Sequence, residues 1–301
     1  MKDRGVDGAE AFRCGSIALI GRPNVGKSTL LNALVGARVS ITSKKPQTTR
    51  HRIRGILTTQ GAQFVFVDTP GYQTEHRSAL NQAMNRGVGQ AIGEVDCVLL
   101  VVEAGRFLEA DRRLLRLVPA AVPLLLVINK TDRLSRDRLL PYLRDAAAQG
   151  NFAEIVPVSA ERQRGLKELL RTIAKYLPEQ PSMFDDDEIT DRDERFLAAE
   201  LIREKLFRLM GDEVPYGSSV VIEQFEETAA LRRIHASIVV EKEGHKPIVI
   251  GAGGEKLKQM ASAARLDMQR LFGGKVHLEI WVKVRGGWTN DARAVKTLGY
   301  E

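Results

Sequence analysis

The sequence has 301 residues, of which 44% are hydrophobic and 28% are charged, and its net charge is +7. This length suffices for two domains, each with its own core. No run of about 18 apolar residues predicts a membrane span, the N-terminal stretch has no signal-peptide core, and two cysteines do not suggest a disulfide framework. We therefore expect an intracellular protein of a reducing compartment.

The first predicted elements are an apolar strand at Ile17–Ile20 and a helix that includes Thr29–Leu34. Residues 21–28 between them read Gly-Arg-Pro-Asn-Val-Gly-Lys-Ser, which fits the phosphate-binding pattern G-x-x-x-x-G-K-[ST] in its required context. The N–H groups of such a loop and the helix N-terminus bind phosphate oxygens. We expect Lys27 to reach the β- and γ-phosphates and Ser28 to hold Mg²⁺. The predicted phosphate ligands are Gly21, Arg22, Pro23, Asn24, Val25, Gly26, Lys27, Ser28 and Thr29.

A polar segment at residues 40–51 comes next, followed by a hairpin with strands predicted at 54–58 and 62–67. The segment has few large apolar residues, so we expect a solvated loop that becomes ordered only around a bound triphosphate. A threonine hydroxyl of this loop is expected to close over Mg²⁺ and the γ-phosphate. Thr48 and Thr49 are both candidates, and Thr49 joins Ser28 and Asp68 in the predicted magnesium set.

The second hairpin strand ends in Asp68, Thr69, Pro70 and Gly71, all predicted to contact the nucleotide or its metal. Asp68 is placed to bind Mg²⁺ through water, and the Gly71 N–H to meet the γ-phosphate. Tyr72 stands where many small GTPases carry a glutamine that orients the attacking water, and Gln73 comes one residue late. We therefore expect slow intrinsic hydrolysis that an external activator raises. The predicted catalytic residues are Lys27, Thr48, Thr49 and Gly71.

Asn24 in the phosphate loop has two interpretations that the sequence leaves open. It resembles the asparagine with which potassium-dependent GTPases hold K⁺ near the β–γ bridge. It is equally suited to a turn.

Two further strands are predicted to carry the residues that select the base. Leu124–Ile128 ends in Asn129-Lys130-Thr131-Asp132, and Ile155–Val158 ends in Ser159-Ala160. A carboxylate at Asp132 accepts from N1–H and the 2-amino group of guanine, whereas adenine would leave it unpaired. The backbone of Ser159 and Ala160 is expected to meet guanine O6. The predicted base ligands are Asn129, Lys130, Asp132, Ser159 and Ala160.

These motifs, in this order over residues 14–178, resemble the translation-factor class of GTPases. The resemblance implies an α/β P-loop domain with a mostly parallel sheet and helices on both faces. Residues 179–190 follow as an acidic linker, in which Asp185–Glu188 is expected to be solvated. A helix is then predicted over Thr190–Met210, with Thr190 and Asp193 as a capping box.

The remaining residues, 191–301, are predicted to form a second, α+β domain with a C-terminal tail. Strands at 218–225 and 234–240 precede Gly251-Ala252-Gly253-Gly254, which we interpret as a turn from a strand at 247–250 into a helix. A GXXG turn in this order is typical of a type II KH domain, whose small residues lie against nucleic-acid phosphates. The predicted RNA ligands are Ile250, Gly251, Ala252, Gly253, Gly254, Lys256, Lys258, Arg265 and Lys283.

Two tryptophans in this domain are assigned by pattern. Trp281 in the predicted last strand, 276–284, is expected in the core. Trp288 is expected to be more exposed, where it would stack on a base or pack the tail.

The switch sequence PQTTRHRIRGI, the DTPG, NKTD and VSA motifs and the GXXG domain together resemble the Era family of bacterial ribosome-assembly GTPases over nearly the whole chain. The resemblance implies GTP, GDP and Mg²⁺ as ligands, and binding to the 3′ end of 16S ribosomal RNA as an assembly factor of the 30S subunit. It also implies a cytoplasmic monomer, partly associated with the inner membrane. Tyr72 departs from the aliphatic residue more common in the family. The alternative is a membrane-associated regulatory switch whose KH-like domain docks protein.

Overall fold

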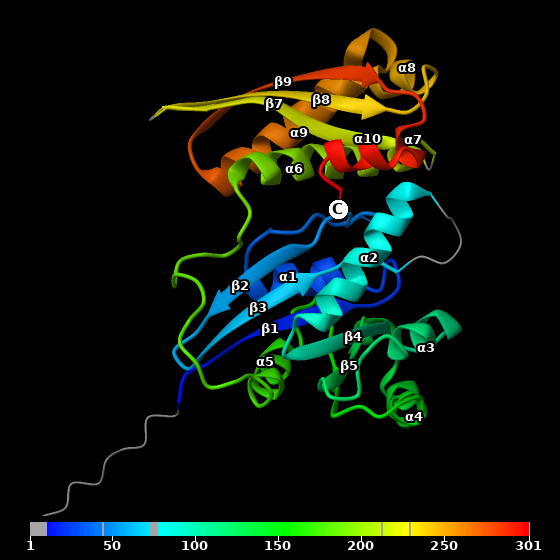
Figure 1. The fold of residues 1–301 in the computed structure, drawn as a ribbon, viewed down its shortest axis with the longest axis vertical. Helices are drawn as coiled ribbons and strands as arrows, with labels where there is room; N and C mark the ends of the chain where they lie inside the picture. The colour runs from blue at the N-terminus through cyan, green and yellow to red at the C-terminus, as the bar shows by residue number, and fades with distance from the viewer. Residues whose placement is uncertain (1–10, 44, 73–77, 212, 229, 301) are drawn as a thin grey trace, which may run out of the picture.

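The computed structural model describes residues 11–43, 45–72, 78–211, 213–228 and 230–300, and shows two units stacked on each other (Figure 1). The first unit is built on a six-stranded sheet in the order β2-β3-β1-β4-β5-β6. All neighbours pair in parallel except β2 with β3, which form the predicted hairpin. The strands are β1 (Arg13–Ile20), β2 (Ile53–Thr58), β3 (Ala62–Asp68), β4 (Cys97–Glu103), β5 (Leu124–Asn129) and β6 (Glu154–Pro157).

Helices cover both faces of this sheet, as predicted. They are α1 (Lys27–Val35), α2 (Ala79–Gly93), α3 (Glu109–Leu115), α4 (Arg136–Ala147) and α5 (Leu166–Ala174). Leu30 of α1 and Leu169 of α5 belong to one apolar core, whereas Val88 of α2 and Leu114 of α3 belong to a second core. Because strands buried on both faces must be apolar throughout, β4 reads as an unbroken apolar run before Glu103.

The second unit packs helices on one face of a three-stranded sheet in the order β7-β8-β9. β7 and β8 are antiparallel, and β8 and β9 are parallel. Its elements are α6 (Glu194–Leu209), α7 (Glu213–Tyr216), β7 (Ser218–Glu227), β8 (Leu231–Val240), α8 (His245–Ile250), α9 (Glu255–Phe272), β9 (Lys275–Val284) and α10 (Ala292–Thr297). No helix within the described ranges combines the length and apolar character needed to cross a membrane.

Two local predictions were wrong. Residues 247–250 form the end of helix α8 rather than a strand, so the GXXG turn joins two helices. Pro247 is compatible with this because it lies in the first turn, where a backbone N–H donor would have no intrahelical acceptor. The helix predicted from Thr190 begins at Glu194, with the Asp193 side chain accepting from the Phe196 N–H at 2.8 Å.

The exposure expected for each of the two tryptophans was also wrong. Trp281 is 44% exposed on the outer face of the sheet, where its ring meets His235 edge-on at 5.4 Å. Val276 and Val282, which lie on the other face of β9, take the core positions, because successive side chains of a strand alternate in direction. Trp288 is fully buried, and its Nε1–H donates to Gly217 O at 3.0 Å. Of the two readings left open for Trp288, the structure favours packing of the tail.

The acidic linker is exposed at its carboxylates, as expected, but its backbone is held against the first sheet. Gln63 of β3 accepts from the N–H groups of Met183 and Phe184, and Ile56 of β2 donates to Ile189 O at 2.9 Å. The linker thereby covers the edge strand β2, which would otherwise present unpaired backbone groups.

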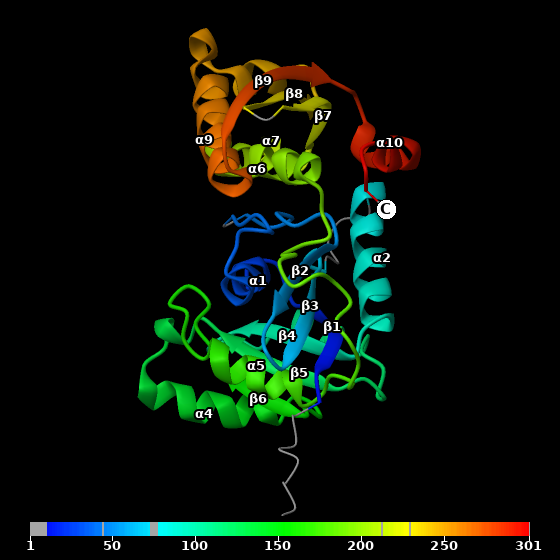
Figure 2. The ribbon, with the colours of Figure 1, turned by 90° about the vertical axis from the view of Figure 1, so that its left-hand side faces the viewer.

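The C-terminal tail of the second unit packs against helix α2 of the first unit. Trp288, Val295 and Tyr300 form an apolar cluster with Leu80 and Met84 of α2. Figure 2 shows α10 directly against the end of α2. The two units are therefore joined by a packed contact as well as by the linker.

Candidate nucleotide and nucleic-acid sites

The loop at residues 21–26 lies at the carboxyl edge of the parallel strands, where ligands of such sheets bind. Gly26 has a φ of 100°, and a Cβ there would lie 2.4 Å from Asn129 Nδ2, so only glycine fits. The Lys27 ammonium is buried and donates to Gly21 O at 2.9 Å and Arg22 O at 3.1 Å. Burial lowers the pKa of Lys27 to about 8, against the opposing charge of Asp68. A phosphate anion beside Lys27 would stabilise its charged form.

The three predicted magnesium ligands converge beside this loop. Ser28 Oγ donates to Asp68 Oδ2 at 2.7 Å, and Thr49 Oγ1 lies 2.8 Å from Ser28 Oγ. Asp68 Oδ1 is buried and has no hydrogen-bond partner in the described part of the chain. Burial raises the pKa of Asp68, although Lys27 and the hydroxyl donors oppose this. A buried carboxylate with an unsatisfied oxygen, next to two hydroxyls, is a donor set that fits Mg²⁺.

The structure separates the two switch threonines that the sequence could not. Thr49 lies in the oxygen cluster, with Oγ1 3.4 Å from Asp68 Oδ2. The Thr48 hydroxyl donates to Lys45 O at 2.7 Å, within its own loop. Residues 41–43 and 45–49, the phosphate loop and Gly71 line a hollow of about 60 Å³, and Thr29 also lines it.

Three polar residues that the sequence analysis did not single out hold these loops in place. The Asn32 side chain of α1 accepts from Val39 N and Ser40 N and donates to Ser40 O at 2.7 Å. The Ser40 hydroxyl donates to Asp68 Oδ2 at 2.8 Å. The buried carboxylate of Asp111 on α3 accepts from Arg22 Nε, which turns the Arg22 side chain towards α3. Residues that hold loops in this way belong to no sequence motif, so the sequence analysis had no signal by which to find them.

Asn129 acts as a hub between three loops. Its Nδ2 donates to Val25 O at 2.9 Å, and its Oδ1 accepts from Lys130 N and Ala160 N. Lys130 Nζ donates to Asn24 O at 2.6 Å and pairs with Glu103 at 3.2 Å. Asn129 and Lys130 therefore connect the base-binding loops to the phosphate loop.

Asp132 and Ser159 lie at the same edge of the sheet. Ser159 Oγ donates to Asp132 Oδ1 at 2.5 Å, and this hydrogen bond lowers the pKa of Asp132. The carboxylate is therefore ionised, as acceptance from a guanine requires. The backbone donors predicted for O6 are already engaged, since Ser159 N donates to Arg164 O and Ala160 N to Asn129 Oδ1. An O6 contact would have to share the Ala160 N–H.

The DTPG turn passes close to the phosphate loop. A Cβ on Gly71 would lie 2.9 Å from Pro23, and the Thr69 hydroxyl donates to Leu19 O at 2.8 Å. Tyr72 packs against the second core of the sheet, so its ring is a structural contact. Gln73 lies outside the described residues. Pro70, which belongs to this turn, is buried.

The GXXG turn presents its small residues to solvent between α8 and α9. Ala252 and Gly253 are exposed, as are the side chains of Lys256 and Lys258 in the first turn of α9. Ile250 and Arg265 are partly buried, and Arg265 Nη1 donates to Gln269 Oε1 at 3.3 Å. Lys283 is not brought to the turn: it forms an ion pair with Glu223 on the outer face of the sheet. The prediction that groups Lys283 with the GXXG residues therefore does not fit this geometry.

The segment at residues 40–51, called here the switch segment, is not a solvated loop. Arg50 is 3% exposed and donates to Ser218 O at 2.7 Å and to Pro215 O and Tyr216 O. Arg203 of α6 donates to Thr48 O. The expectation of a free loop was wrong because its partners belong to the second unit and are distant in sequence.

His51 at the end of the switch segment gives a pH-dependent prediction. Its ring stacks on Tyr300 at 4.7 Å and meets Phe196 edge-on at 5.2 Å. Burial, together with the nearby charges of Arg203, Arg192 and Arg50 and against that of Glu200, lowers the pKa of His51 to about 4. The unfolded chain, with a histidine pKa near 6.5, therefore binds more protons than the folded protein between these values. The contribution of the neutral His51 ring to the free energy of unfolding is therefore present above pH 6.5 and is lost as the pH falls towards 4.

His51→Phe keeps the ring contacts and removes the titration. Between pH 7 and 4.5, the wild-type free energy of unfolding is expected to lose about 2 to 3 kcal/mol more than that of the variant. Urea unfolding of both proteins at the two pH values measures the difference. Equal losses would show that His51 does not titrate in this way.

The phosphate loop, the oxygen cluster and the NKTD turn on a mostly parallel sheet define a P-loop GTPase, joined here to a KH domain. Residues 16–130 match the family described as 50S ribosome-binding GTPase, and residues 213–289 match the KH domain family. The GTPase Era of Nitrosomonas eutropha is 58% identical over 294 residues, covering 97% of this chain and 99% of that protein. The GTPase Era of Bordetella avium is 54% identical, with the same coverage. The chain belongs to the Era family of GTPases, and it is an enzyme that hydrolyses GTP.

Solved structures give the same result for the fold. Aquifex aeolicus Era, as a point variant bound to GDP and AlF₄⁻, is 37% identical and superposes with a TM-score of 0.92 over 96% of this chain and 99% of that one. An Era complex with MgGDPNP and nucleotides 1506–1542 of 16S ribosomal RNA has the same identity and coverage, with a TM-score of 0.93.

Proposed function

We propose that this GTPase binds the 3′ end region of 16S ribosomal RNA through its GXXG turn and serves as a GTP-controlled assembly factor of the 30S subunit. The observation that carries the proposal is the contact of the switch segment with the KH domain. A solved relative that holds both MgGDPNP and a 16S ribosomal RNA fragment supports the choice of ligand.

The proposed control acts through this contact. Thr49 and Thr48 are adjacent, and one lies in the oxygen cluster while the carbonyl of the other accepts from Arg203 of α6. The next residue, Arg50, donates to three carbonyls that precede and begin β7. A γ-phosphate that moves Thr49 must therefore move or break contacts to the KH domain, which is how an order–disorder switch acts on a neighbour.

Mg²⁺ would be held by Ser28, Thr49 and Asp68, and it would neutralise charge on the β- and γ-phosphate oxygens. Lys27 contributes a positive charge to the same oxygens. The Gly71 N–H is proposed to meet the γ-phosphate. Tyr72 packs against the second core of the sheet and stands where many small GTPases carry the glutamine that orients the attacking water, so we expect slow intrinsic hydrolysis.

The proposal is tested by the affinity for a single-stranded RNA that ends in a pyrimidine-rich tail. We expect the protein loaded with Mg²⁺ and a non-hydrolysable GTP analogue to bind this RNA at least about tenfold more tightly than the GDP form, a typical coupling of about 1.4 kcal/mol. Fluorescence anisotropy at a fixed salt concentration measures both affinities. Equal affinities would remove the coupling, and no binding in either state would remove the RNA function.

Potassium use is a separate proposal that rests on Asn24. This residue has a φ of 65° and an exposed side chain at the lip of the phosphate loop. If the side chain helps to hold K⁺, single-turnover GTP hydrolysis should be about tenfold faster in K⁺ than in Na⁺, a modest share of electrostatic stabilisation. Asn24→Ala should abolish the difference. Equal wild-type rates in the two salts would assign Asn24 to the turn alone.

Peripheral membrane association, a monomeric state and a protein-docking role for the KH domain remain predictions. The ratio of absorbance at 260 and 280 nm of the purified protein separates the RNA proposal from the protein-docking one. Copurified RNA would count against the second.

A further inference from the structure

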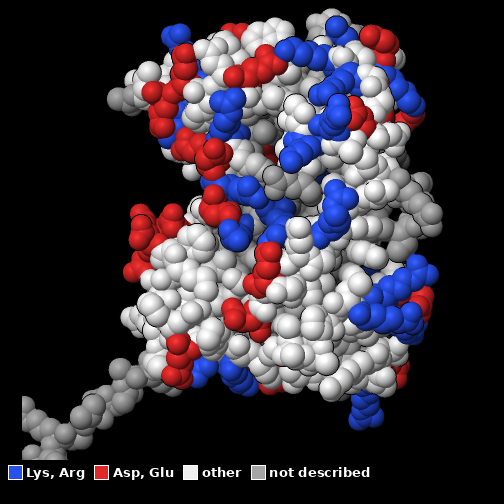
Figure 3. Space-filling view, viewed as in Figure 1, with Lys and Arg blue, Asp and Glu red and all other residues white. Residues whose placement is uncertain are grey.

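A cavity of about 630 Å³ lies between the two domains, next to the linker. In the space-filling view, Lys and Arg side chains gather in the hollow between the upper and lower parts of the molecule (Figure 3). Five arginines line the cavity: Arg50 of the switch segment, Arg52 directly after it, Arg54 of β2, Arg192 between the linker and α6, and Arg203 of α6. None of them belongs to the nucleotide site or to the GXXG turn.

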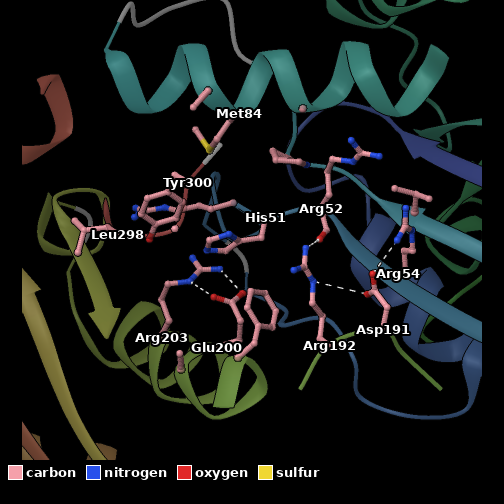
Figure 4. Close-up of a pocket in the computed structure, with 18 of the residues that line it drawn as sticks. His51, Arg52, Arg54, Met84, Asp191, Arg192, Glu200, Arg203, Leu298 and Tyr300 are labelled. Atoms are coloured by element: carbon pink, nitrogen blue, oxygen red, sulfur yellow. Dashed lines mark hydrogen bonds and ion pairs between the residues drawn. The ribbon is translucent and has the colours of Figure 1, made fainter. Parts of the chain in front are cut away.

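The positive charge of this cavity exceeds the negative charge that faces it. Its carboxylates are Glu94, Asp191 and Glu200. Glu200 pairs with Arg203 through two contacts of 2.7 Å, as Figure 4 shows. Glu94 pairs with Arg52 at 2.6 Å, and Asp191 with Arg54 at 3.1 Å. Asp191 Oδ1 also lies 3.7 Å from Arg192 Nε, so two arginines share this carboxylate. The five arginines and three carboxylates leave a net charge of +2 in the lining.

Several guanidinium donors in the lining are buried without an acceptor. Arg50 Nε and Arg203 Nη1 have no hydrogen-bond partner among the residues that the structure describes, and these side chains are at most 3% exposed. Arg192 Nε also has no hydrogen-bond partner in that part of the chain, but the Arg192 side chain is 35% exposed and its Nε lies 3.7 Å from Asp191 Oδ1. Burial lowers the pKa of Arg50, and the charge of Arg203 lowers it too, against Tyr300 and Glu200. Unpaired buried donors of this kind are costly, so they indicate a ligand that accepts from them.

Aromatic and apolar side chains also line the cavity. His51 stacks on Tyr300 next to Met84 (Figure 4), and the Arg192 guanidinium lies over the Phe196 ring at 4.7 Å. The neutral His51 ring adds no charge. The volume lies in the range that holds a ligand as large as a nucleotide. A cluster of arginine donors beside an aromatic wall suits a phosphoryl group, because the guanidinium fork matches its oxygens.

We propose that this cavity binds a phosphoryl group, carried either by a free phosphorylated small molecule or by the backbone of a bound RNA. The anion accepts from donors of the switch segment and of α6 at once. It therefore holds the two domains in the arrangement seen here, and this role is independent of which RNA the GXXG turn binds.

The test uses the full chain saturated with Mg²⁺ and a non-hydrolysable GTP analogue, so that the phosphate loop is filled. Isothermal titration with inorganic phosphate and with pyrophosphate is expected to show one saturable site. Arg192→Gln, at a partly exposed position between the linker and α6, should weaken this binding at least about tenfold. Glu200→Gln removes the carboxylate that competes for Arg203 and should tighten it by a similar factor. Arg171→Gln makes the same charge change at an exposed pair on α5 and should leave the binding unchanged.

The expected gain in phosphate affinity of Glu200→Gln distinguishes a ligand site from a purely structural arginine cluster. For a structural cluster, the substitution would lower only the stability of the protein. The source of the phosphate follows from the RNA affinity of Arg192→Gln. An unchanged RNA affinity assigns the site to a free phosphorylated molecule, and a parallel loss assigns it to an RNA phosphate. Absence of saturable binding in the wild type, or equal binding in Arg192→Gln and Arg171→Gln, would overturn the proposal.

Discussion

Asp132→Asn is expected to lower the affinity for GTP by a factor of about 10² to 10³ and to create affinity for xanthosine triphosphate. The carboxylate is ionised, since the Ser159 hydroxyl donates to it and lowers its pKa. An asparagine replaces one acceptor oxygen by an NH₂ donor, which then faces the N1–H and 2-amino donors of guanine. Xanthine carries an oxygen in place of the 2-amino group, so the amide pairs with it.

The two affinities are measured by competition with a fluorescent nucleotide. The matched control is Asp137→Asn, which makes the same change at an exposed position in the first turn of α4. It should leave the preference for GTP over xanthosine triphosphate as in the wild type. If Asp132→Asn also leaves that preference intact, guanine selection does not depend on this carboxylate.

The nucleotide site could be predicted from sequence because each of its parts is local. The phosphate loop, the DTPG turn and the NKTD turn each follow a buried strand within a few residues, and parallel strands bring their carboxyl ends to one edge. The sequence alone therefore assigns Ser28 and Asp68 to one metal site, and the structure places their side-chain oxygens 2.7 Å apart. The sequence could not decide whether Thr48 or Thr49 binds Mg²⁺, because this depends on which hydroxyl points towards Ser28 and Asp68.

The contacts between the domains could not be predicted. Arg203 reaches Thr48 across 155 positions, and Tyr300 stacks on His51 from the end of the chain. The polar composition of the switch segment indicated a solvated loop because buried arginines are rare unless paired. Here carbonyl oxygens from the KH domain are the partners of Arg50, and no pattern in the segment itself encodes them.

The errors in the KH domain have two physical causes. Short apolar runs such as residues 247–250 read equally as a strand or as a helix turn. In β9, the core face is set by alternation, and the larger Trp281 and the charged Lys283 share the outer face while the smaller Val282 is buried. Size and hydrophobicity alone assigned Trp281 to the wrong face.

Replacement of Gly253 and Gly254 together by aspartate is expected to lower the affinity for RNA at least about a hundredfold, while the affinity for GTP stays within a factor of about two. Both glycines have positive φ, 57° and 81°, and a Cβ at either position meets nothing within 4 Å. Aspartate is among the residues that tolerate this backbone region, so the fold is expected to persist. The two carboxylates would repel the phosphates that the turn is proposed to contact.

The control has to separate this local effect from the change in net charge. Gly286→Asp with Gly287→Asp also places two adjacent carboxylates at exposed glycines of the same domain, with open space around each, and Gly287 shares the left-handed backbone of the GXXG glycines. Because these positions lie after β9, the control should retain most of the RNA affinity. RNA affinity is measured by anisotropy at several salt concentrations, and the wild-type salt dependence should become shallower only in the GXXG variant. An equal loss in both variants would mean that the GXXG turn does not contact the strand, and a parallel loss of GTP affinity would mean that the two sites are not separate.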